Sequence, residues 1–300
     1  MDSKKSKTQK EKIILAGEIA KQIKVYIKPL IKKGVPLLEI AEKIENKIKE
    51  LGGEPSFPTN LSIDNIAAHY TPSHNDETLA HGLLKVDFGA HVDGWTSDTA
   101  FSIDLENNEE NKKLIEASKQ ALDNAIKFVK EGNPTTGGIG KIVQETIESH
   151  GFSPIVNLSG HEMDQYELHA GLTIPNINDQ TDIPLKNGLY AIEPFSTNGN
   201  GKVHDGSPSG IYALTNDKMP RSEIARDVLE FIIEKYQTLP FCSRWVVNVL
   251  GTKALFGLRQ LEDNGNLHNF AQLVELKGSK VAQSENTILI EKECVIVTTE

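Results

Sequence analysis

Two acidic residues in neighbouring strands constrain the fold of this chain more than any other feature. Residues 85–104 predict a hairpin that turns at Asp93-Gly94, because Asp-Gly between two strand-like runs is a strong hairpin signal. With this turn, period-two alternation places Asp87 and Asp98 on the same face, as diagonal neighbours roughly 7–8 Å apart at the backbone. Such carboxylates are either solvated on an exposed face or held together by a cation between them.

Length, charge and cysteine content limit the classes of protein to which this chain can belong. The 300 residues suit one large domain or one domain with a smaller insertion, and the net charge of −10 argues against nucleic acid as the main ligand. We expect no membrane contact, since no apolar run reaches transmembrane length and the N-terminus lacks the apolar stretch of a secretory signal. Cys242 and Cys294 are expected to be reduced thiols in a cytoplasmic protein.

Hydrophobic periodicity predicts an α+β fold with a curved antiparallel sheet. Residues 1–12 are rich in lysine and serine and are expected to form a disordered basic tail. Residues 201–270 change in character and predict a helical insertion, with helices near 222–236 and 252–262. Elsewhere we expect helices at about 10–33, 37–53, 107–132 and 138–150, and strands at 154–161, 189–196, 271–278, 286–293 and 294–300.

Three later polar residues lie at predicted strand positions or strand ends and complete a possible metal site. His161, Glu193 and Glu285 join Asp87 and Asp98 to give four carboxylates and one imidazole, although each residue alone could be a surface or turn residue. Oxygen-rich ligation with one nitrogen is typical of sites for Mn²⁺, Fe²⁺, Co²⁺ or Zn²⁺. It is not typical of a closed structural zinc site, which would use Cys and His. Four carboxylates roughly neutralise two divalent ions, and two ions about 3.5–4 Å apart form a hydrolytic centre.

The motifs around these residues resemble those of the type II methionine aminopeptidases, in the short form found in archaea. The resemblance covers residues 13–300 and is carried by KVDFGAHVDGWTSDTA, NLSGHEMDQYELHAGLTIPN, YAIEPFST, IAAHYTP, LPFCSRW and VIVTTE. It implies the pita-bread fold, in which two helix pairs flank a curved antiparallel sheet. The catalytic domain would comprise residues 13–200 and 271–300, and residues 201–270 would be a winged-helix-like insertion.

The resemblance implies two divalent metal ions per chain, of Co, Mn, Fe or Zn. By the family pattern, Asp87 binds one ion, Asp98 and Glu285 bridge both ions, and His161 and Glu193 complete the other site. A hydroxide bridging the ions would attack the scissile carbonyl. Glu193 would also carry a proton from the attacking water to the leaving amine.

The resemblance further implies the substrate and the residues that bind it. The enzyme would remove the initiator methionine from nascent polypeptides whose second residue is small. His69 and His169 would act as hydrogen-bond donors to the scissile amide or to the developing oxyanion. The methionine side chain would bind in an apolar pocket, whose candidate residues could equally be ordinary core residues: Phe57, Leu168, Phe270 and Leu273. N-terminal peptides of nascent chains are thus the expected partners of a monomer, and contact with the ribosome stays open.

Three departures from the family pattern affect the surroundings of the site. Ser284 and Asn286 replace an aromatic residue and a histidine on either side of Glu285, so interactions behind this ligand are expected to differ. The connection from residue 70 to residue 87 is about two residues short, and His81-Gly82 replaces an acidic turn. We therefore expect an altered pocket entrance near His74 and His81.

Two alternatives share the fold. A prolidase-like hydrolase of X-Pro bonds would use the same ligands, but such enzymes usually carry an additional N-terminal domain and other motifs. A non-catalytic binding protein of the same fold would typically have lost ligands, whereas this chain keeps all five.

Overall fold

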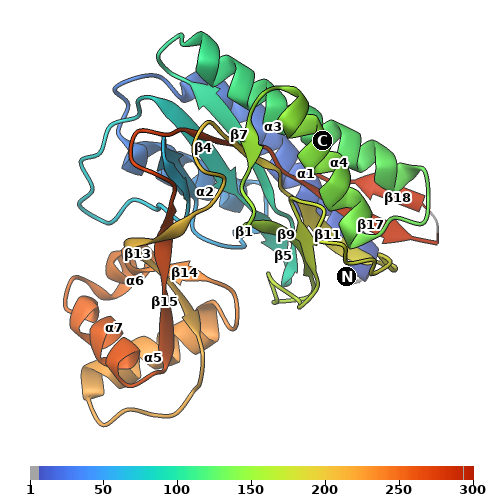
Figure 1. Ribbon diagram of the computed structural model, residues 1–300. Helices are drawn as coiled ribbons and strands as arrows, with labels where there is room; N and C mark the ends of the chain where they lie inside the picture. Colours follow the sequence, from blue (N-terminus) through green and yellow to red (C-terminus); the bar gives the residue numbers. More distant parts are fainter. Residues whose placement is uncertain (1–6, 293) are drawn as a thin grey trace.

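The computed structural model describes residues 7–292 and 294–300, which form antiparallel sheets covered by helices (Figure 1). Two helix pairs flank the central sheets, as the sequence predicts. The first pair is α1 (Gln9–Ile27) and α2 (Leu37–Glu50), and the second is α3 (Glu109–Lys130) and α4 (Thr136–Ser149). Every strand pairing among the described residues is antiparallel.

The first half of the fold packs α1 and α2 on a sheet of order β2-β4-β7. These strands are β2 (Asn60–Ile63), β4 (Leu83–Phe88) and β7 (Thr99–Asp104). Buried isoleucines of both helices, such as Ile23 and Ile40, form one core cluster with Val86 and Phe88 of β4. Because Val86 and Phe88 face this core, alternation turns Asp87 to the opposite face of the strand.

The second half packs α3 and α4 on a five-stranded sheet of order β10-β9-β11-β17-β18. Its strands are β10 (Thr173–Pro175), β9 (Ser159–Met163), β11 (Gly188–Ile192), β17 (Asn286–Glu291) and β18 (Cys294–Val297). Tyr190, Ile192 and Ile288 pack against the apolar faces of the two helices. A bridge between Ala100 and Glu285 then brings this half against β7 of the first.

Two small sheets complete the central layer. One has the order β1-β5-β6, from β1 (Glu54–Pro55), β5 (Ala90–Val92) and β6 (Trp95–Thr96). The other has the order β16-β12-β8, from β16 (Val281–Gln283), β12 (Phe195–Thr197) and β8 (Ser153–Pro154).

The segment 201–270 is mixed rather than purely helical. It contains the helices α5 (Glu223–Lys235), α6 (Ser243–Leu250) and α7 (Ala254–Asp263), and the strands β13 (His204–Leu214) and β14 (Phe241–Cys242). With β15 (Leu267–Val274) and β3 (Ile66–Ala68) the strands form a sheet of order β14-β13-β15-β3. The three helices lie apart from α1–α4 (Figure 1) and share their own core cluster, which includes Val228, Leu229 and Leu258.

The predicted hairpin register is confirmed, but the hairpin is interrupted. Asp87 pairs with Ala100 in the β4–β7 ladder, and His91 pairs with Thr96 in the β5–β6 ladder, as a turn at Asp93-Gly94 requires. Between the two ladders a Cβ atom at position 89 would overlap the carbonyl oxygen of Ser97, so only glycine fits there.

Several predicted boundaries were wrong for identifiable reasons. α1 ends at Ile27 and a 3₁₀ helix, η1 (Lys28–Leu30), follows, because Pro29 cannot continue an α-helix. The helix also begins within the predicted disordered tail, at Gln9, where Thr8 and Glu11 form a capping box; residues 1–6 of that tail lie outside the described residues. The strand predicted from residue 154 is formed only from Ser159 onward as β9, while Ser153–Pro154 pairs elsewhere as β8.

Two further expectations concern membranes and cysteines. Among the described helices, none is both long enough and apolar enough to cross a bilayer. Cys242 is buried, Cys294 is exposed, and both are free thiols, as predicted.

Candidate metal centre and substrate pocket

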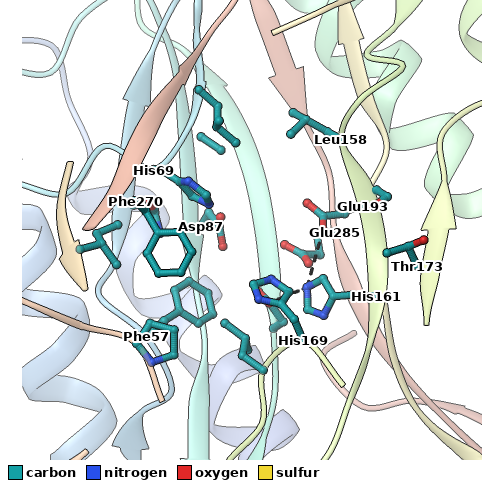
Figure 2. Close-up of a pocket in the computed structure, with 18 of the residues that line it drawn as sticks. Phe57, His69, Asp87, Leu158, His161, His169, Thr173, Glu193, Phe270 and Glu285 are labelled. Carbon is teal, nitrogen blue, oxygen red and sulfur yellow. Dashed lines mark ion pairs between the residues drawn. The ribbon is translucent and has the colours of Figure 1, made fainter. Parts of the chain in front are cut away.

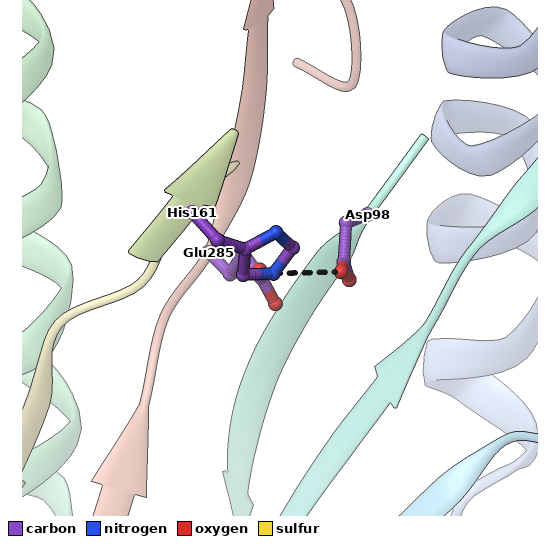
Figure 3. A group of neighbouring side chains, drawn as sticks. All are labelled: Asp98, His161 and Glu285. Atoms are coloured by element: carbon purple, nitrogen blue, oxygen red, sulfur yellow. Dashed lines mark ion pairs between the residues drawn. The ribbon is translucent and has the colours of Figure 1, made fainter. Parts of the chain in front are cut away.

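Three predicted ligands from three separate segments converge at the junction of the two halves. Asp98 lies just before β7, His161 lies on β9, and Glu285 lies between β16 and β17. One ligand atom from each residue lies within 4.8 Å of the others, and all three side chains are buried (Figure 3). The Nε2 atom of His161 is 3.6 Å from Oδ2 of Asp98. This spacing leaves room for an ion between side chains that could all ligate it.

Hydrogen bonds between threonine hydroxyls and the backbone fix two of these ligands relative to each other. The hydroxyl of Thr287 accepts from the amide of Asp98 at 2.8 Å and donates to its carbonyl oxygen at 2.7 Å. The hydroxyl of Thr99 donates to the carbonyl oxygen of Glu285 at 2.8 Å. Each ligand is therefore bound by a threonine that lies one or two residues after the other ligand in the sequence, so the positions of the two ligands are coupled.

Glu193 and Asp87 add two carboxylates to this centre. Glu193 lies between β11 and β12, with Oε1 3.7 Å from Nε2 of His161. The Asp87 carboxylate lies across the cavity from Glu193 and Glu285 (Figure 2). The structure therefore brings all five predicted ligands around one space.

One polar residue of the centre was missed by sequence reasoning. Gln283 is buried, and its Nε2 donates to Oε2 of Glu285 at 3.4 Å. It also lies close enough to Asp87 and Glu193 to lower the pKa of both carboxyls through hydrogen bonds, against the larger effect of burial. Gln283 precedes Glu285 by two positions, and period-two alternation would have placed both side chains on the same face.

The electrostatics of the centre call for a cation. Burial, followed by the charges of neighbouring carboxylates, raises the pKa of Asp87, Glu193 and Glu285 well above the ordinary range, and burial raises the pKa of Asp98 to about 7. Burial lowers the pKa of His161 to about 4, so its imidazole is neutral and able to ligate. Oδ1 of Asp87 and Oδ1 of Asp98 are buried without a hydrogen-bond partner. Unpartnered oxygens and one neutral nitrogen fit divalent metal ions.

The two accessory histidines line the same cavity. The ring centre of His169 is 4.3 Å from that of His161, and burial lowers the pKa of His169 to about 3. His69 follows β3 with a left-handed backbone, φ 64°. Its Nδ1 is 3.2 Å from the carbonyl oxygen of Ala271, and burial lowers its pKa to about 4. Both imidazoles are thus neutral near pH 7.

The hydrogen bond to Ala271 determines the tautomer of His69. A carbonyl oxygen only accepts, so Nδ1 of His69 must carry the proton, and Nε2 of the neutral ring is an acceptor. This differs from the predicted donor role. An acceptor here suits the N–H of a scissile amide and not a developing oxyanion.

An apolar cavity of about 330 Å³ adjoins the carboxylates. The predicted pocket residues Phe57, Leu168, Phe270 and Leu273 all line it, together with every predicted ligand and both histidines. Ile211 and Pro240 of the insertion line it as well, which sequence reasoning did not foresee. His74 and His81 are not among its lining residues, and an altered entrance near them stays a prediction.

The departures beside Glu285 have specific contacts. The hydroxyl of Ser284 lies 3.0 Å from the hydroxyl of Ser118 on α3. Oδ1 of Asn286 accepts from Nζ of Lys24 at 2.8 Å and from the hydroxyl of Thr299 at 2.9 Å. Burial lowers the pKa of Lys24 to about 8. The partly buried ammonium group of Lys24 is thus hydrogen-bonded to the residue that follows the ligand Glu285.

Comparisons with known proteins found relatives that match nearly the whole chain. The family model "Metallopeptidase family M24" matches residues 11–292. A methionine aminopeptidase of Thermococcus onnurineus is 46% identical over 296 residues, which cover 97% of this chain and 99% of the relative.

Two solved structures are similar in fold. The methionine aminopeptidase of Thermotoga maritima matches with a TM-score of 0.71 at 23% identity, over 100% of both chains. A thermophilic Arx1 matches with a TM-score of 0.79 at 18% identity, over 96% of this chain and 89% of the other. At such identities the likeness concerns the fold alone, and it confirms the predicted pita-bread architecture.

Proposed function

Because the chain belongs to metallopeptidase family M24 and, within it, to the methionine aminopeptidases, we propose that it removes the initiator methionine from nascent polypeptides whose second residue is small. Membership of this family makes the chain a metal-dependent aminopeptidase. The substrate, the two ions and the roles of individual residues belong to the proposal.

One observation carries the proposal. The predicted ligands and both accessory histidines surround one cavity, and the apolar part of that cavity adjoins the carboxylates. A substrate with an unbranched apolar side chain can therefore place its side chain among Phe57, Leu168 and Phe270 while its first peptide bond lies beside Glu193.

The five ligands would hold two divalent ions, with Asp98 and Glu285 shared between them. Bound there, the ions would supply Lewis acidity and lower the pKa of a water molecule toward neutrality. Which of Co, Mn, Fe or Zn serves in the cell is part of the test.

Side chains of the protein would transfer the protons and orient the peptide. Glu193 would accept the proton of the attacking water and deliver it to the leaving amine. Nε2 of His69, as an acceptor, would bind the N–H of the scissile amide, and His169 would bind the carbonyl side. Both rings lie against the cavity and keep the peptide bond in one orientation.

A peptide panel tests the proposal. The purified protein, loaded separately with Mn²⁺, Fe²⁺, Co²⁺ or Zn²⁺, would be given Met-Ala, Met-Gly, Met-Leu, Leu-Ala and Ala-Pro peptides. We expect release of methionine from Met-Ala and Met-Gly, with little cleavage of the others. Asp98→Asn would serve as the inactive control. Cleavage of Ala-Pro alone would establish a prolidase, and absence of turnover with every metal would establish a non-catalytic binding protein.

The proposed setting follows from the proposed substrate. Nascent chains expose their N-termini in the cytoplasm, which is where we place the enzyme. We propose that it acts as a monomer, which the family resemblance implies.

A further inference from the structure

A buried ion pair joins the insertion to the body of the protein. Arg244 on α6 is 1% exposed and Glu45 on α2 is 4% exposed. The guanidinium donates from Nη1 to Oε2 at 2.7 Å and from Nη2 to Oε1 at 2.8 Å. A second ion pair between these parts, Lys235 with Glu54, is 3.5 Å long, and its side chains are 49% and 42% exposed. Exposed pairs of that kind constrain structure weakly.

The pair also binds both ends of the segment 57–72, which carries Phe57 and His69. Oε1 of Glu45 accepts from the amide of Thr59 at 3.2 Å, two residues after Phe57. Nε of Arg244 donates to the carbonyl oxygen of Pro72 at 3.0 Å, three residues after His69. The two ends are themselves joined, because the hydroxyl of Thr71 donates to the carbonyl oxygen of Thr59 at 2.9 Å.

The hydrogen-bonding capacity of the pair is well used. Oε2 of Glu45 accepts a further hydrogen bond from Nε1 of Trp245 at 2.8 Å. Burial of two charges is costly, and an apolar pair of similar volume is often as stable, so such a network adds little to net stability. What the planar guanidinium supplies is a fixed distance and a fixed orientation between the groups that it joins.

The network supports one wall of the cavity. Phe57 and His69 line it from the segment 57–72, and Ile211 and Phe270 line it from β13 and β15, of which β15 pairs with β3. The ring of His69 is 5.6 Å from the ring of Phe270, in an edge contact. A change at the ion pair would therefore move this wall relative to the ligands His161, Glu193 and Glu285 on the other side (Figure 2).

We propose that Arg244, paired with Glu45, is a positioning residue for the substrate pocket. It holds the segment 57–72 in a fixed position relative to the insertion, so that His69 and Phe57 contact the same substrate as the insertion residues that line the pocket. The role rests on the proposed function, because it concerns the same pocket. The proposal also assigns a role to the insertion, because Arg244 belongs to it.

The test is a double-mutant cycle on the metal-loaded full chain. Arg244→Lys keeps the charge but removes the planar fork and the bond to Pro72. We expect kcat/KM for a Met-Ala peptide to fall between about tenfold and 100-fold, with metal content unchanged, since misplaced groups cost rate in this range. In combination with His69→Ala, the loss should be smaller than the product of the two single losses, because Arg244 acts through His69.

Two controls separate positioning from general stability. Arg259→Lys makes the same substitution at an exposed site on α7. Val228→Ala opens a cavity in the core of the insertion, away from the pocket. We expect both to leave kcat/KM unchanged, although Val228→Ala should lower Tm. If Arg244→Lys fails to fold, Glu45→Gln enters the same cycle. An unchanged kcat/KM in both variants, or losses that multiply with His69→Ala, would overturn the role.

A second readout does not depend on turnover. In histidine-labelled, metal-free protein, the NMR resonances of the His69 ring should shift in Arg244→Lys and stay in place in Arg259→Lys. If the wild-type enzyme cleaves no Met-Ala peptide, the proposed function fails, and this measurement still decides the positioning role. Unshifted His69 resonances in Arg244→Lys would then contradict it.

Discussion

Nδ1 of His69 lies 3.2 Å from the carbonyl oxygen of Ala271 on β15, the strand that pairs with β3 just before His69. The contact leaves Nε2 of this cavity-lining ring as an acceptor. The imidazole is therefore oriented by the neighbouring strand and can present the complementary group to an amide N–H. A left-handed backbone at His69 is the conformational cost of this placement.

Replacing His69 should lower activity without disturbing the metal site. His69→Ala is expected to reduce kcat/KM for a Met-Ala peptide by about 10² to 10³, the range for loss of one well-placed catalytic hydrogen bond. Metal content, measured by mass spectrometry, should match the wild type because His69 is not a ligand. His150→Ala, at the C-terminal end of α4, is the matched control and should leave both quantities unchanged. Loss of metal from His69→Ala would contradict this account.

Asp98 and Asp87 should differ in how many ions their loss removes. Asp98→Asn is expected to reduce metal content toward zero, because this carboxylate lies at the convergence with His161 and Glu285 and would serve both ions. Asp87→Asn should leave about one ion, since Asp87 lies on the other side of the cavity. Elemental analysis after dialysis measures both. Asp93→Asn, an exposed turn residue whose left-handed backbone asparagine tolerates, is the control. Equal stoichiometry in the two variants would refute separate roles.

The stability of the metal-free protein, relative to that of the metal-loaded protein, should fall as pH rises above about 6.5. The pKa of Asp98 is raised from 3.8 to about 7, so the folded state holds a proton that the unfolded state has lost, and this contribution disappears as pH passes about 7. The buried histidines act in the opposite direction. The pKa values of His69 and His161 are lowered from 6.5 to about 4, so the stability that they add is complete by about pH 6.5.

Thermal unfolding at several pH values tests this balance. After chelation, Tm should fall increasingly below that of the metal-loaded protein between about pH 6.5 and 8.5, because the folded metal-free state loses the protons of its buried carboxyls there while ligation keeps them ionised throughout. Lys24 and Lys85, whose pKa values burial lowers to about 8 and about 7, add stability as pH rises through the same range, but they do so in both forms. In Glu285→Gln the difference in Tm between the two forms should change less with pH. A difference in Tm that does not change with pH would show that the four carboxylates do not share a buried, uncompensated site.

The contact between Lys24 and Asn286 should influence metal affinity from behind Glu285. Asn286→Ala removes the acceptor of Lys24 and Thr299, and leaves a partly buried ammonium without its amide partner. We expect the unfolding free energy to fall by about 1–3 kcal/mol. Metal affinity should fall between about tenfold and 100-fold, as is typical when groups supporting a ligand are lost. Calorimetric titration with Mn²⁺ measures the affinity, and Asn75→Ala, at an exposed position, is the control.

The fold and the site differ in how far the sequence predicted them. The register of the hairpin followed from local turn chemistry at Asp93-Gly94, and the structure has that register. The convergence of Asp98 with His161 and Glu285 depends on pairings between distant segments. No periodicity encodes those pairings. Residue type and predicted strand position suggested the set of five residues, and the family resemblance assigned the roles of the ligands.

Other features could not be predicted from the sequence, because they depend on tertiary contacts. Arg244 lies in LPFCSRW, where a charged side chain gives no sign that it will be buried against α2. The tautomer of His69 depends on a carbonyl group on β15, about 200 positions away. Pro29, by contrast, was a local signal for the end of α1 and could have been used.

The hydrogen bond from Thr99 to Glu285 closes a loop of 186 positions, and the site exists only once it has closed. Loop-closure entropy and high contact order place such an event late in folding. A partly folded chain would therefore expose scattered carboxylates and no ligand cage. Metal uptake should report the final step of folding, and a chain that misfolds in either half should neither retain ions nor hydrolyse peptides prematurely.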